Sequence, residues 1–111
     1  MKAPTMGEFE EIVLLAVCGL KNEAYAIMIQ ERIEEKTHRS ATMGAIYSAL
    51  ERLEEKGYAV SRLGEITRQR GGRRKRFYRV TPAGMAALHK VRETRERLWQ
   101  DIEPLPELSP S

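Results

Sequence analysis

The chain has 111 residues, of which 41% are hydrophobic and 32% are charged, and its net charge at pH 7 is +3. This length is enough for one compact domain with a small core and too short for two. Three acids lead into the first apolar run, which is much shorter than a membrane span, so the sequence favours neither a secreted nor a membrane-embedded protein.

The first predicted helix runs from Thr5 to about Leu20. Thr5 and Glu8 have the spacing of a capping box, in which two side chains hydrogen-bond free backbone amides at the start of a helix. The middle of the segment is apolar almost all round, which indicates a helix at the centre of the core. Cys18, the only cysteine, lies in this apolar part. We therefore expect a buried thiol, no internal disulfide and a reducing, cytoplasmic environment.

A second helix is predicted from Tyr25 to Lys36, with Asn22 as a candidate cap. Apolar residues recur on one side of this segment and charged residues on the other, as in an ordinary amphipathic helix. The apolar positions are Ala26, Ile29 and Ile33. The polar residues 37–41 that follow predict a linker or a brief edge strand.

A third helix is predicted from Met43 to Lys56, because Thr42 has the side chain of an N-cap and Gly57 suits the left-handed residue that ends a helix. Its apolar and polar positions separate onto opposite faces. One face is formed by Ile46, Ala49, Leu50 and Leu53, and the other by Gly44, Ser48, Glu51 and Glu55. The exposed face is therefore small and uncharged in its N-terminal half, which suits a helix that enters the major groove of DNA by its N-terminus.

Two segments rich in β-branched and aromatic residues, Tyr58 to Leu63 and Lys75 to Val80, predict the strands of a hairpin whose tip includes Gly71 and Gly72. A basic stretch, residues 62–79, spans this hairpin and carries eight Lys or Arg against the single acid Glu65. Its charge is thus +7 in a chain of net charge +3, so the remaining residues sum to −4. One concentrated cationic projection on a mildly acidic body indicates contact with a polyanion.

A fourth helix is predicted to begin at Thr81-Pro82, with the hydroxyl as N-cap and proline at the first helical position, and to run to about Glu103, ended by Pro104. Apolar residues along it recur at heptad-like spacing, with Arg95 on the same seam. These residues are Leu88, Val91, Leu98 and Ile102. Because nothing is left in the protomer to cover this seam, we expect a homodimer. The residues after 103 are expected to be loosely held.

This order of elements is that of a winged helix-turn-helix, a mainly α (α+β) fold with a two-stranded wing and a long C-terminal dimerisation helix. The expected organisation is a DNA-binding domain over residues 1–80, a dimerisation helix over 81–103 and a tail over 104–111. In this fold the second helix positions the third, and the third reads the bases.

The candidate DNA contacts form two groups. The third helix and its cap supply Thr42, Met43, Gly44, Tyr47, Ser48 and Arg52, and the wing supplies Arg70, Gly72, Arg73, Arg74 and Lys75. Tyr47 either donates its hydroxyl to a phosphate or is an ordinary packed tyrosine. Arg52 either reaches a phosphate or pairs with Glu51 or Glu55. For the small residues a capping or packing role is the alternative, whereas arginines at a wing tip suit the narrow, negative minor groove.

Neither histidine predicts a metal site or a catalytic site. His38 and His89 are far apart in the sequence, and neither has a cysteine or a carboxylate at metal-ligand spacing. We therefore expect no enzymatic activity, no metal and no cofactor.

Two long motifs occur in the order expected of a known family. They are residues 44–57, GAIYSALERLEEKG, and residues 71–84, GGRRKRFYRVTPAG, supported by residues 10–17 and 23–27. In these motifs the chain resembles the PadR family of bacterial transcriptional regulators over nearly its whole length. It departs from the family pattern at Ala26, where glycine is usual, and in the high charge of its terminal helix.

The resemblance implies a homodimeric, repressor-type protein that binds an inverted repeat in a promoter, with a single C-terminal dimerisation helix as in the shorter members. In short members that sense drugs, a tryptophan of the terminal helix lines a ligand pocket between the protomers. Trp99, about one turn later, is the corresponding candidate, and dimer packing is its alternative role.

Two other functions are left open. One is a winged-helix module whose basic stretch binds an acidic protein. The other is a regulator whose primary role is sensing a small molecule, which would require a flat, mainly aromatic and apolar gap at the dimer centre.

Overall fold

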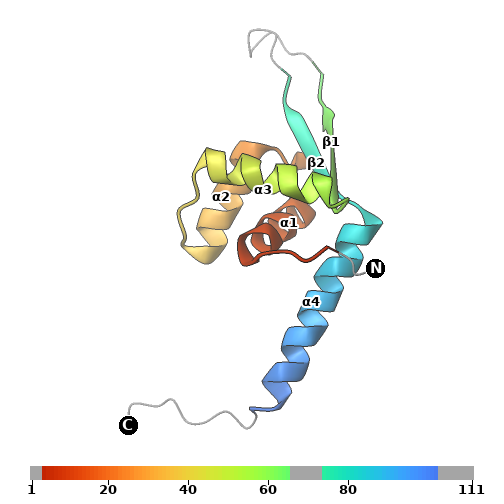
Figure 1. Ribbon diagram of the computed structural model, residues 1–111. Helices are drawn as coiled ribbons and strands as arrows, with labels where there is room; N and C mark the ends of the chain where they lie inside the picture. Colours follow the sequence, from red (N-terminus) through yellow and green to blue (C-terminus); the bar gives the residue numbers. More distant parts are fainter. Residues whose placement is uncertain (1–3, 66–73, 103–111) are drawn as a thin grey trace.

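The structure is a computed structural model that describes residues 4–65 and 74–102. The helices are α1 (Glu8–Leu20), α2 (Ala26–Thr37), α3 (Met43–Glu55) and α4 (Pro82–Gln100), the strands are β1 (Ala59–Leu63) and β2 (Arg76–Val80), and a 3-10 turn, η1 (Lys21–Glu23), follows α1. Figure 1 shows α1, α2 and α3 packed together, the hairpin projecting from them, and α4 extending in the opposite direction. The predicted winged helix-turn-helix is confirmed. No helix among the described residues has the length and apolar character to cross a membrane.

The core is built around α1, which packs against both α2 and α3. The largest fully buried side chains come from these three helices. They are Val13, Leu14, Val17, Ile29, Ile33, Ile46, Leu50 and Leu53. Burying a side chain of this size contributes about 1.5–3 kcal/mol, so the position of α3 is set mainly by the apolar face that the sequence predicted.

Helix α3 begins at Met43 as predicted and ends at Glu55, one residue before the predicted end. The Thr42 hydroxyl accepts a hydrogen bond from the amide of Ala45, with an N–O distance of 3.1 Å. At the other end Gly57 has φ 80°, a left-handed conformation that favours glycine. The four predicted core residues of this helix are buried, and the four predicted for its opposite face are exposed.

The predicted start of α1 is wrong. The helix begins at Glu8 with Gly7 at the N-cap, and no side chain caps it. Thr5 lies outside the helix because the backbone around it is bound elsewhere. Its carbonyl accepts a hydrogen bond from Lys56 Nζ at 2.6 Å, and the carbonyl of Pro4 accepts one from the Tyr58 hydroxyl. The segment before α1 is therefore held against the end of α3.

The prediction that Cys18 is buried is also wrong for the protomer, because its side chain is exposed. Cys18 and Leu15 are three residues apart and share a side of α1 that α2 and α3 leave uncovered. The sulfur atoms of Cys18 and Met85 lie 3.6 Å apart where α4 approaches this side. The proposed cap of α2 was wrong as well, since no side chain caps that helix and Asn22 belongs to η1.

The hairpin is antiparallel, with Ala59 opposite Val80 and Leu63 opposite Arg76. The middle of β2 is held beside η1 by a hydrogen bond, 2.8 Å long, from the Tyr78 amide to the carbonyl of Ala24, the residue that follows η1. Of residues 37–41, predicted to be a linker or a brief edge strand, Thr37 is the last residue of α2 and residues 38–41 form no strand. The base of the hairpin therefore has a defined position relative to the start of α2.

Helix α4 starts as predicted, with Pro82 at the first position and the Thr81 hydroxyl accepting from the Gly84 amide at 3.0 Å. A Cβ atom on Gly84 would lie 2.2 Å from the carbonyl oxygen of Tyr58, so only glycine allows this close approach. Pro104, predicted to end the helix, lies outside the described residues. The junction fixes the start of α4 against the base of the hairpin.

Candidate nucleic-acid interface

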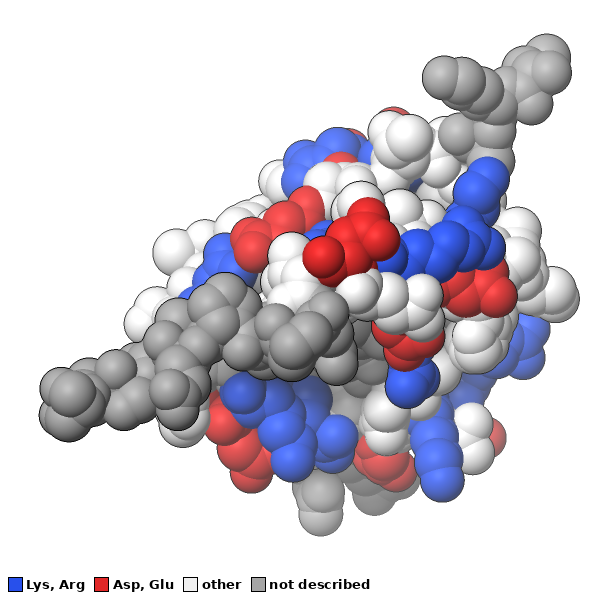
Figure 2. All heavy atoms as spheres, turned by 90° about the horizontal axis from the view of Figure 1, so that it is seen from below, with Lys and Arg blue, Asp and Glu red and all other residues white. Residues whose placement is uncertain are grey.

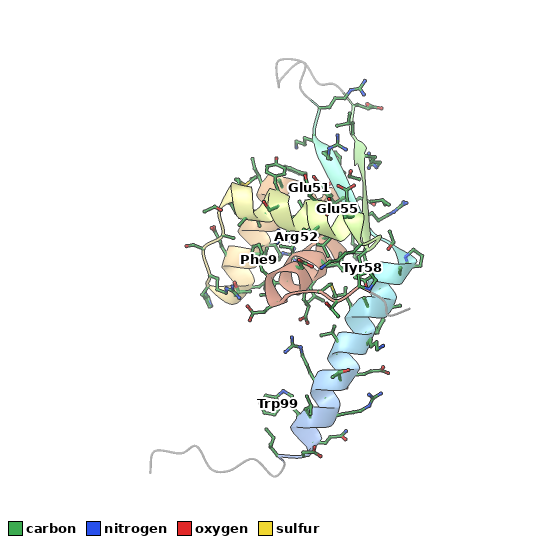
Figure 3. The ribbon with its side chains drawn as sticks, viewed as in Figure 1. Phe9, Glu51, Arg52, Glu55, Tyr58 and Trp99 are labelled. Carbon is green, nitrogen blue, oxygen red and sulfur yellow. The ribbon has the colours of Figure 1, made fainter. Side chains whose placement is uncertain are left out.

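The exposed face of α3 presents small side chains and one ring. Thr42, Gly44, Tyr47 and Ser48 are all exposed, and a Cβ atom added to Gly44 would contact nothing within 4 Å. Met43 differs from this group because it is half-buried and packs against the core. Glu51 and Glu55 lie further along the same face (Figure 3). The N-terminal half of α3 is therefore an uncharged, accessible surface.

Arg52 pairs with neither predicted partner. Its Nε donates to Glu10 Oε2 on α1 at 2.8 Å, and Lys56 Nζ lies 2.5 Å from the other carboxylate oxygen of Glu10. We call these three residues the Glu10 cluster; Figure 3 shows Arg52 directed from α3 toward α1. The Arg52 side chain is still 48% exposed, so its guanidinium is accessible from solvent.

Glu10 is the buried acid of the described chain, with 7% of its surface exposed. Burial alone would raise the pKa of Glu10, but the hydrogen bonds from Lys56 and Arg52 and their positive charges outweigh burial, so the pKa lies below its usual value. Sequence reasoning missed this residue. A signal was present, since Glu10 precedes Val13, Leu14 and Val17 at the spacing of the buried face of α1.

The described part of the wing carries five of the eight cations of the basic stretch. These are Arg62, Arg74, Lys75, Arg76 and Arg79. Three predicted contacts, Arg70, Gly72 and Arg73, lie outside the described residues. Arg74 is exposed, and Lys75 is half-buried with its Nζ 3.9 Å from the centre of the Tyr25 ring.

Aromatic contacts stabilise the hairpin against Tyr25, the residue that precedes α2. The rings of Tyr25 and Phe77 meet edge to face with their centres 5.6 Å apart, and the Arg62 guanidinium lies 5.0 Å from the centre of the Phe77 ring. On the other face of the hairpin Tyr78 is buried, and burial, reinforced by the charge of Glu54, raises the pKa of its hydroxyl. Tyr25 and Phe77 were not predicted as part of the site; the alternation of Phe77 with Tyr78 on one strand was the available signal.

The predicted seam of α4 is exposed toward its C-terminal end. Leu98 and, just past the helix, Ile102 are exposed, as is Trp99, and Val91 is half-buried. Figure 3 shows Trp99 projecting from α4 well away from the three-helix core. Leu88 differs from the prediction, because it is 8% exposed and packs in the core of its own protomer. Arg95, expected on the seam, instead donates from Nη2 to Glu11 Oε1 at 2.9 Å.

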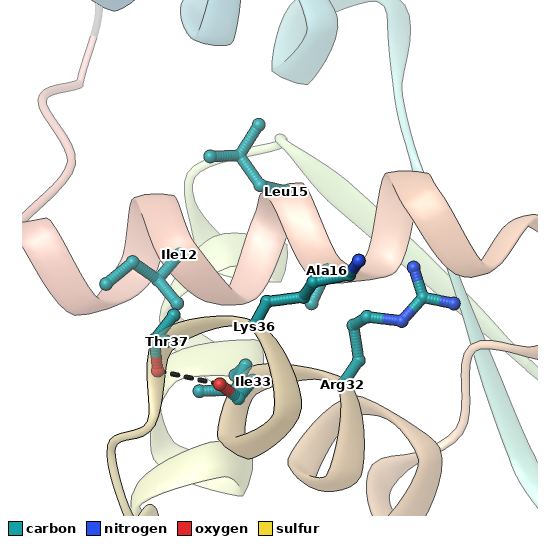
Figure 4. Close-up of a pocket in the computed structure, with 7 residues that line it drawn as sticks. All are labelled: Ile12, Leu15, Ala16, Arg32, Ile33, Lys36 and Thr37. Atoms are coloured by element: carbon teal, nitrogen blue, oxygen red, sulfur yellow. Dashed lines mark hydrogen bonds between the residues drawn. The ribbon is translucent and has the colours of Figure 1, made fainter.

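A pocket of about 240 Å³ lies between α1 and α2. Its lining is mainly apolar, with two cations, and consists of Ile12, Leu15, Ala16, Arg32, Ile33, Lys36 and Thr37. In Figure 4 the Thr37 hydroxyl points to the Ile33 carbonyl, to which it donates at 2.6 Å. Trp99, the candidate ligand residue, is not among the lining residues.

The face of the molecule seen from below in Figure 2 carries both basic and acidic side chains, interspersed with uncharged residues. Within residues 4–65 and 74–102, no group of three His, Cys, Asp or Glu side chains is placed to hold a metal ion. The described part of the basic stretch, by contrast, carries five cations and the single acid Glu65.

Comparisons with known proteins agree with this architecture. The model of the transcriptional regulator PadR-like family matches residues 14–90. The transcriptional regulator Rv3488 of Mycobacterium tuberculosis is 35% identical over 81 residues, which cover 73% of this chain and 71% of that protein.

Solved structures share the fold. A transcriptional regulator from Clostridium thermocellum, Cth-833, has a TM-score of 0.69 and 28% identity, covering 88% of this chain and 89% of its own. Bacillus subtilis PadR, solved in complex with operator DNA, has a TM-score of 0.62 and 23% identity, covering 74% of this chain and 46% of its own. Because the family match extends over well more than half of its residues, the chain belongs to the PadR-like family of transcriptional regulators.

Proposed function

We propose that this transcriptional regulator is a sequence-specific DNA-binding repressor that binds an inverted-repeat operator as a homodimer. The observation that carries the proposal is the accessible, uncharged N-terminal half of α3 beside a cationic wing. The first surface suits base edges in the major groove, and the second suits phosphates and the minor groove. The Bacillus subtilis structure, which contains operator DNA, supports the same use of this fold.

Within this proposal the two surfaces have different duties. Thr42, Gly44, Tyr47 and Ser48 face the bases or the adjacent phosphates, and the described wing residues Arg74 and Lys75 supply affinity. Arg52 is accessible enough to contact a phosphate while its Nε remains bound to Glu10. Residues 1–80 act as the DNA-binding domain, and α4 holds the two copies together.

The dimer proposal rests on the exposed apolar side chains of α4 and α1. Leu98, Trp99, Ile102 and Leu15 are each about half exposed or more. A second copy that covers these side chains removes apolar surface from water, at roughly 25 cal/mol for each Å². Two α3 helices in such a dimer would enter successive major grooves about 34 Å apart.

The test is fluorescence anisotropy with a duplex from the region upstream of the gene. We expect tighter binding to this duplex than to a scrambled one of the same length, and a palindromic footprint. Tyr47→Ala and Ser48→Ala should weaken the preference, whereas Lys90→Ala, a matched exposed position on α4, should leave it unchanged. Equal affinity for both duplexes would refute sequence-specific recognition.

A ligand-sensing role is the second candidate, and the exposed ring of Trp99 is the observation that favours it. A planar aromatic compound stacked on Trp99 between the two copies would quench its fluorescence, and Trp99 is the only tryptophan in the chain. Quenching that saturates and that Leu98→Glu abolishes would support a site at the dimer centre. Unchanged fluorescence across a panel of such compounds would argue against it.

A further inference from the structure

A second cationic feature lies at the base of the wing, away from its tip. A shallow pocket of about 120 Å³ is formed between η1 and one face of the hairpin. Its lining is Lys21, Asn22, Val60, Ser61, Arg62 and Arg79. Three of these six residues are cations and none is an acid. We call it the wing-base pocket.

The fold brings these cations together from two separate segments. Val60 and Arg79 are opposite each other in the antiparallel register, so their side chains lie on one face, and Arg62 is two residues from Val60 on that face. Lys21 comes from η1, which the Tyr78–Ala24 hydrogen bond fixes to the hairpin. The arrangement therefore does not depend on the tip of the wing.

The three cations are uncompensated within the described part of the chain. None of Lys21, Arg62 and Arg79 forms an ion pair with another described residue, although ion pairs form elsewhere even between exposed side chains. The acids nearest in sequence are Glu23, in the same turn as Lys21, and Glu65, three residues after Arg62. Glu54 accepts a hydrogen bond from Ser61 at 2.8 Å. None of these three acids lines the pocket.

The backbone at Lys21 is also unusual. Lys21 has φ 55°, a left-handed conformation that favours glycine, yet a lysine occupies it. Strained backbone often marks a functional site, and this strained, charged residue lines a pocket. Lys21→Gly would remove the cation without straining the backbone, because glycine adopts this conformation readily.

We propose that the wing-base pocket binds a phosphate group of the DNA backbone, in addition to the contacts of α3 and the wing tip. Arginine and lysine are the side chains that proteins use for phosphate, because they donate charge-assisted hydrogen bonds to its oxygens. Val60 is the one apolar side chain in the lining, and the pocket volume of about 120 Å³ is well below the roughly 300–1,000 Å³ of small-molecule sites. A single phosphate group of a polymer needs less room than a whole small ligand.

This inference rests on the proposed DNA binding, and it predicts a measurable change in salt dependence. Each phosphate contact with B-DNA contributes about 0.9 to the slope of log affinity against log salt. Lys21→Gly combined with Arg79→Gln should therefore flatten the slope by about 0.9 for each phosphate lost per dimer. Lys90→Ala, which removes a positive charge from α4, should leave the slope unchanged.

The slopes are measured by anisotropy on both the upstream duplex and the scrambled duplex, with circular dichroism to confirm that each variant folds. Equal affinity for the two duplexes would refute sequence-specific recognition, while the slopes on either duplex would still test the pocket. An unchanged slope in the double variant overturns the pocket proposal even when specific binding is intact.

A free phosphate compound is the other source of the same chemistry. Inorganic phosphate is added to the DNA-free protein at constant ionic strength, and the backbone amide NMR signals of Asn22 and Arg79 are followed. Saturable shifts, together with an unchanged DNA salt slope in the double variant, would assign the pocket to a free ligand and overturn the DNA assignment. A flattened slope without such shifts supports it.

Discussion

Replacing Glu10 with glutamine is expected to lower the free energy of unfolding by about 2 kcal/mol at pH 7. Breaking a buried ion pair costs roughly 3–5 kcal/mol, and one hydrogen bond to a charged group contributes about 1.5–3 kcal/mol. The cost is reduced here because the partners reach water: the side chains of Arg52 and Lys56 are 48% and 25% exposed. Glutamine also keeps one acceptor oxygen. A value near the lower end of these ranges follows.

The difference between wild type and Glu10→Gln should depend on pH with a defined sign. The folded-state pKa of Glu10 lies below its usual value, since the hydrogen bonds and charges of Lys56 and Arg52 outweigh the effect of burial. The ionised carboxylate therefore stabilises the fold fully above the unfolded-state pKa, about 4.3. That stabilisation is lost as the pH falls through the lower folded-state pKa.

Urea denaturation followed by circular dichroism, at one fixed protein concentration, measures this difference at pH 7 and at several acidic values. Glu8→Gln is the matched control, because it makes the same change on the same helix in a pair whose carboxylate is 70% exposed. Its cost should not exceed about 1 kcal/mol. A Glu10→Gln effect no larger than the control, or one that persists unchanged in acid, would refute the role assigned to the ionised Glu10 cluster.

Two further substitutions test the helix junctions. Gly84→Ala should destabilise the fold by about 2 kcal/mol, because the added Cβ would lie 2.2 Å from the Tyr58 carbonyl oxygen. That carbonyl cannot move freely, since it accepts a hydrogen bond from the Thr81 amide at 3.0 Å. A thermal melt with no loss of stability would show that the backbone at this junction can shift. Thr42→Ala should lower the free energy of unfolding by about 1 kcal/mol, because the hydroxyl that caps α3 is lost. Thr5→Ala should cause no measurable loss in urea denaturation, because Thr5 makes its hydrogen bond through the backbone carbonyl. An equal loss of stability in Thr5→Ala and Thr42→Ala would indicate that the Thr5 side chain caps α1 after all.

The elements could be predicted where the signal is local. Thr42 and Gly57 mark the ends of α3 because a cap and a left-handed residue act within one turn. The two strands follow from their β-branched and aromatic residues, and each begins one residue later than predicted. These features depend on neighbours in the sequence and on nothing distant.

The parts that failed depend on distant contacts. The partner of Arg52 was sought at Glu51 and Glu55, which are close in sequence, whereas Glu10 is 42 residues away. The capping box at Thr5 had the right spacing but lost to the contacts that bind residues 4–5 to Lys56 and Tyr58. Local patterns therefore indicated which residues carry charge, and tertiary packing decided which charges meet.

The chain belongs to a family of transcriptional regulators, which are not enzymes. For Cys18 the relevant property is therefore which side chains cover its thiol. In one protomer the thiol is exposed beside Leu15, on the side of α1 that faces α4. If a second copy covers this side through α4, the apolar character of α1 all round its middle is explained by a partner rather than by the protomer core. The expectation of a buried thiol would then hold for the dimer.

The rate of Cys18 alkylation by N-ethylmaleimide tests this idea directly. We expect slow alkylation at high protein concentration and faster alkylation on dilution, because the dimer dissociates and uncovers the thiol. Leu98→Glu, which places a charge on the exposed seam of α4, should give the fast rate at every concentration, whereas Lys90→Ala should behave as wild type. A fast rate in wild type that does not change with concentration, while sedimentation shows a dimer, would mean that the two copies meet elsewhere.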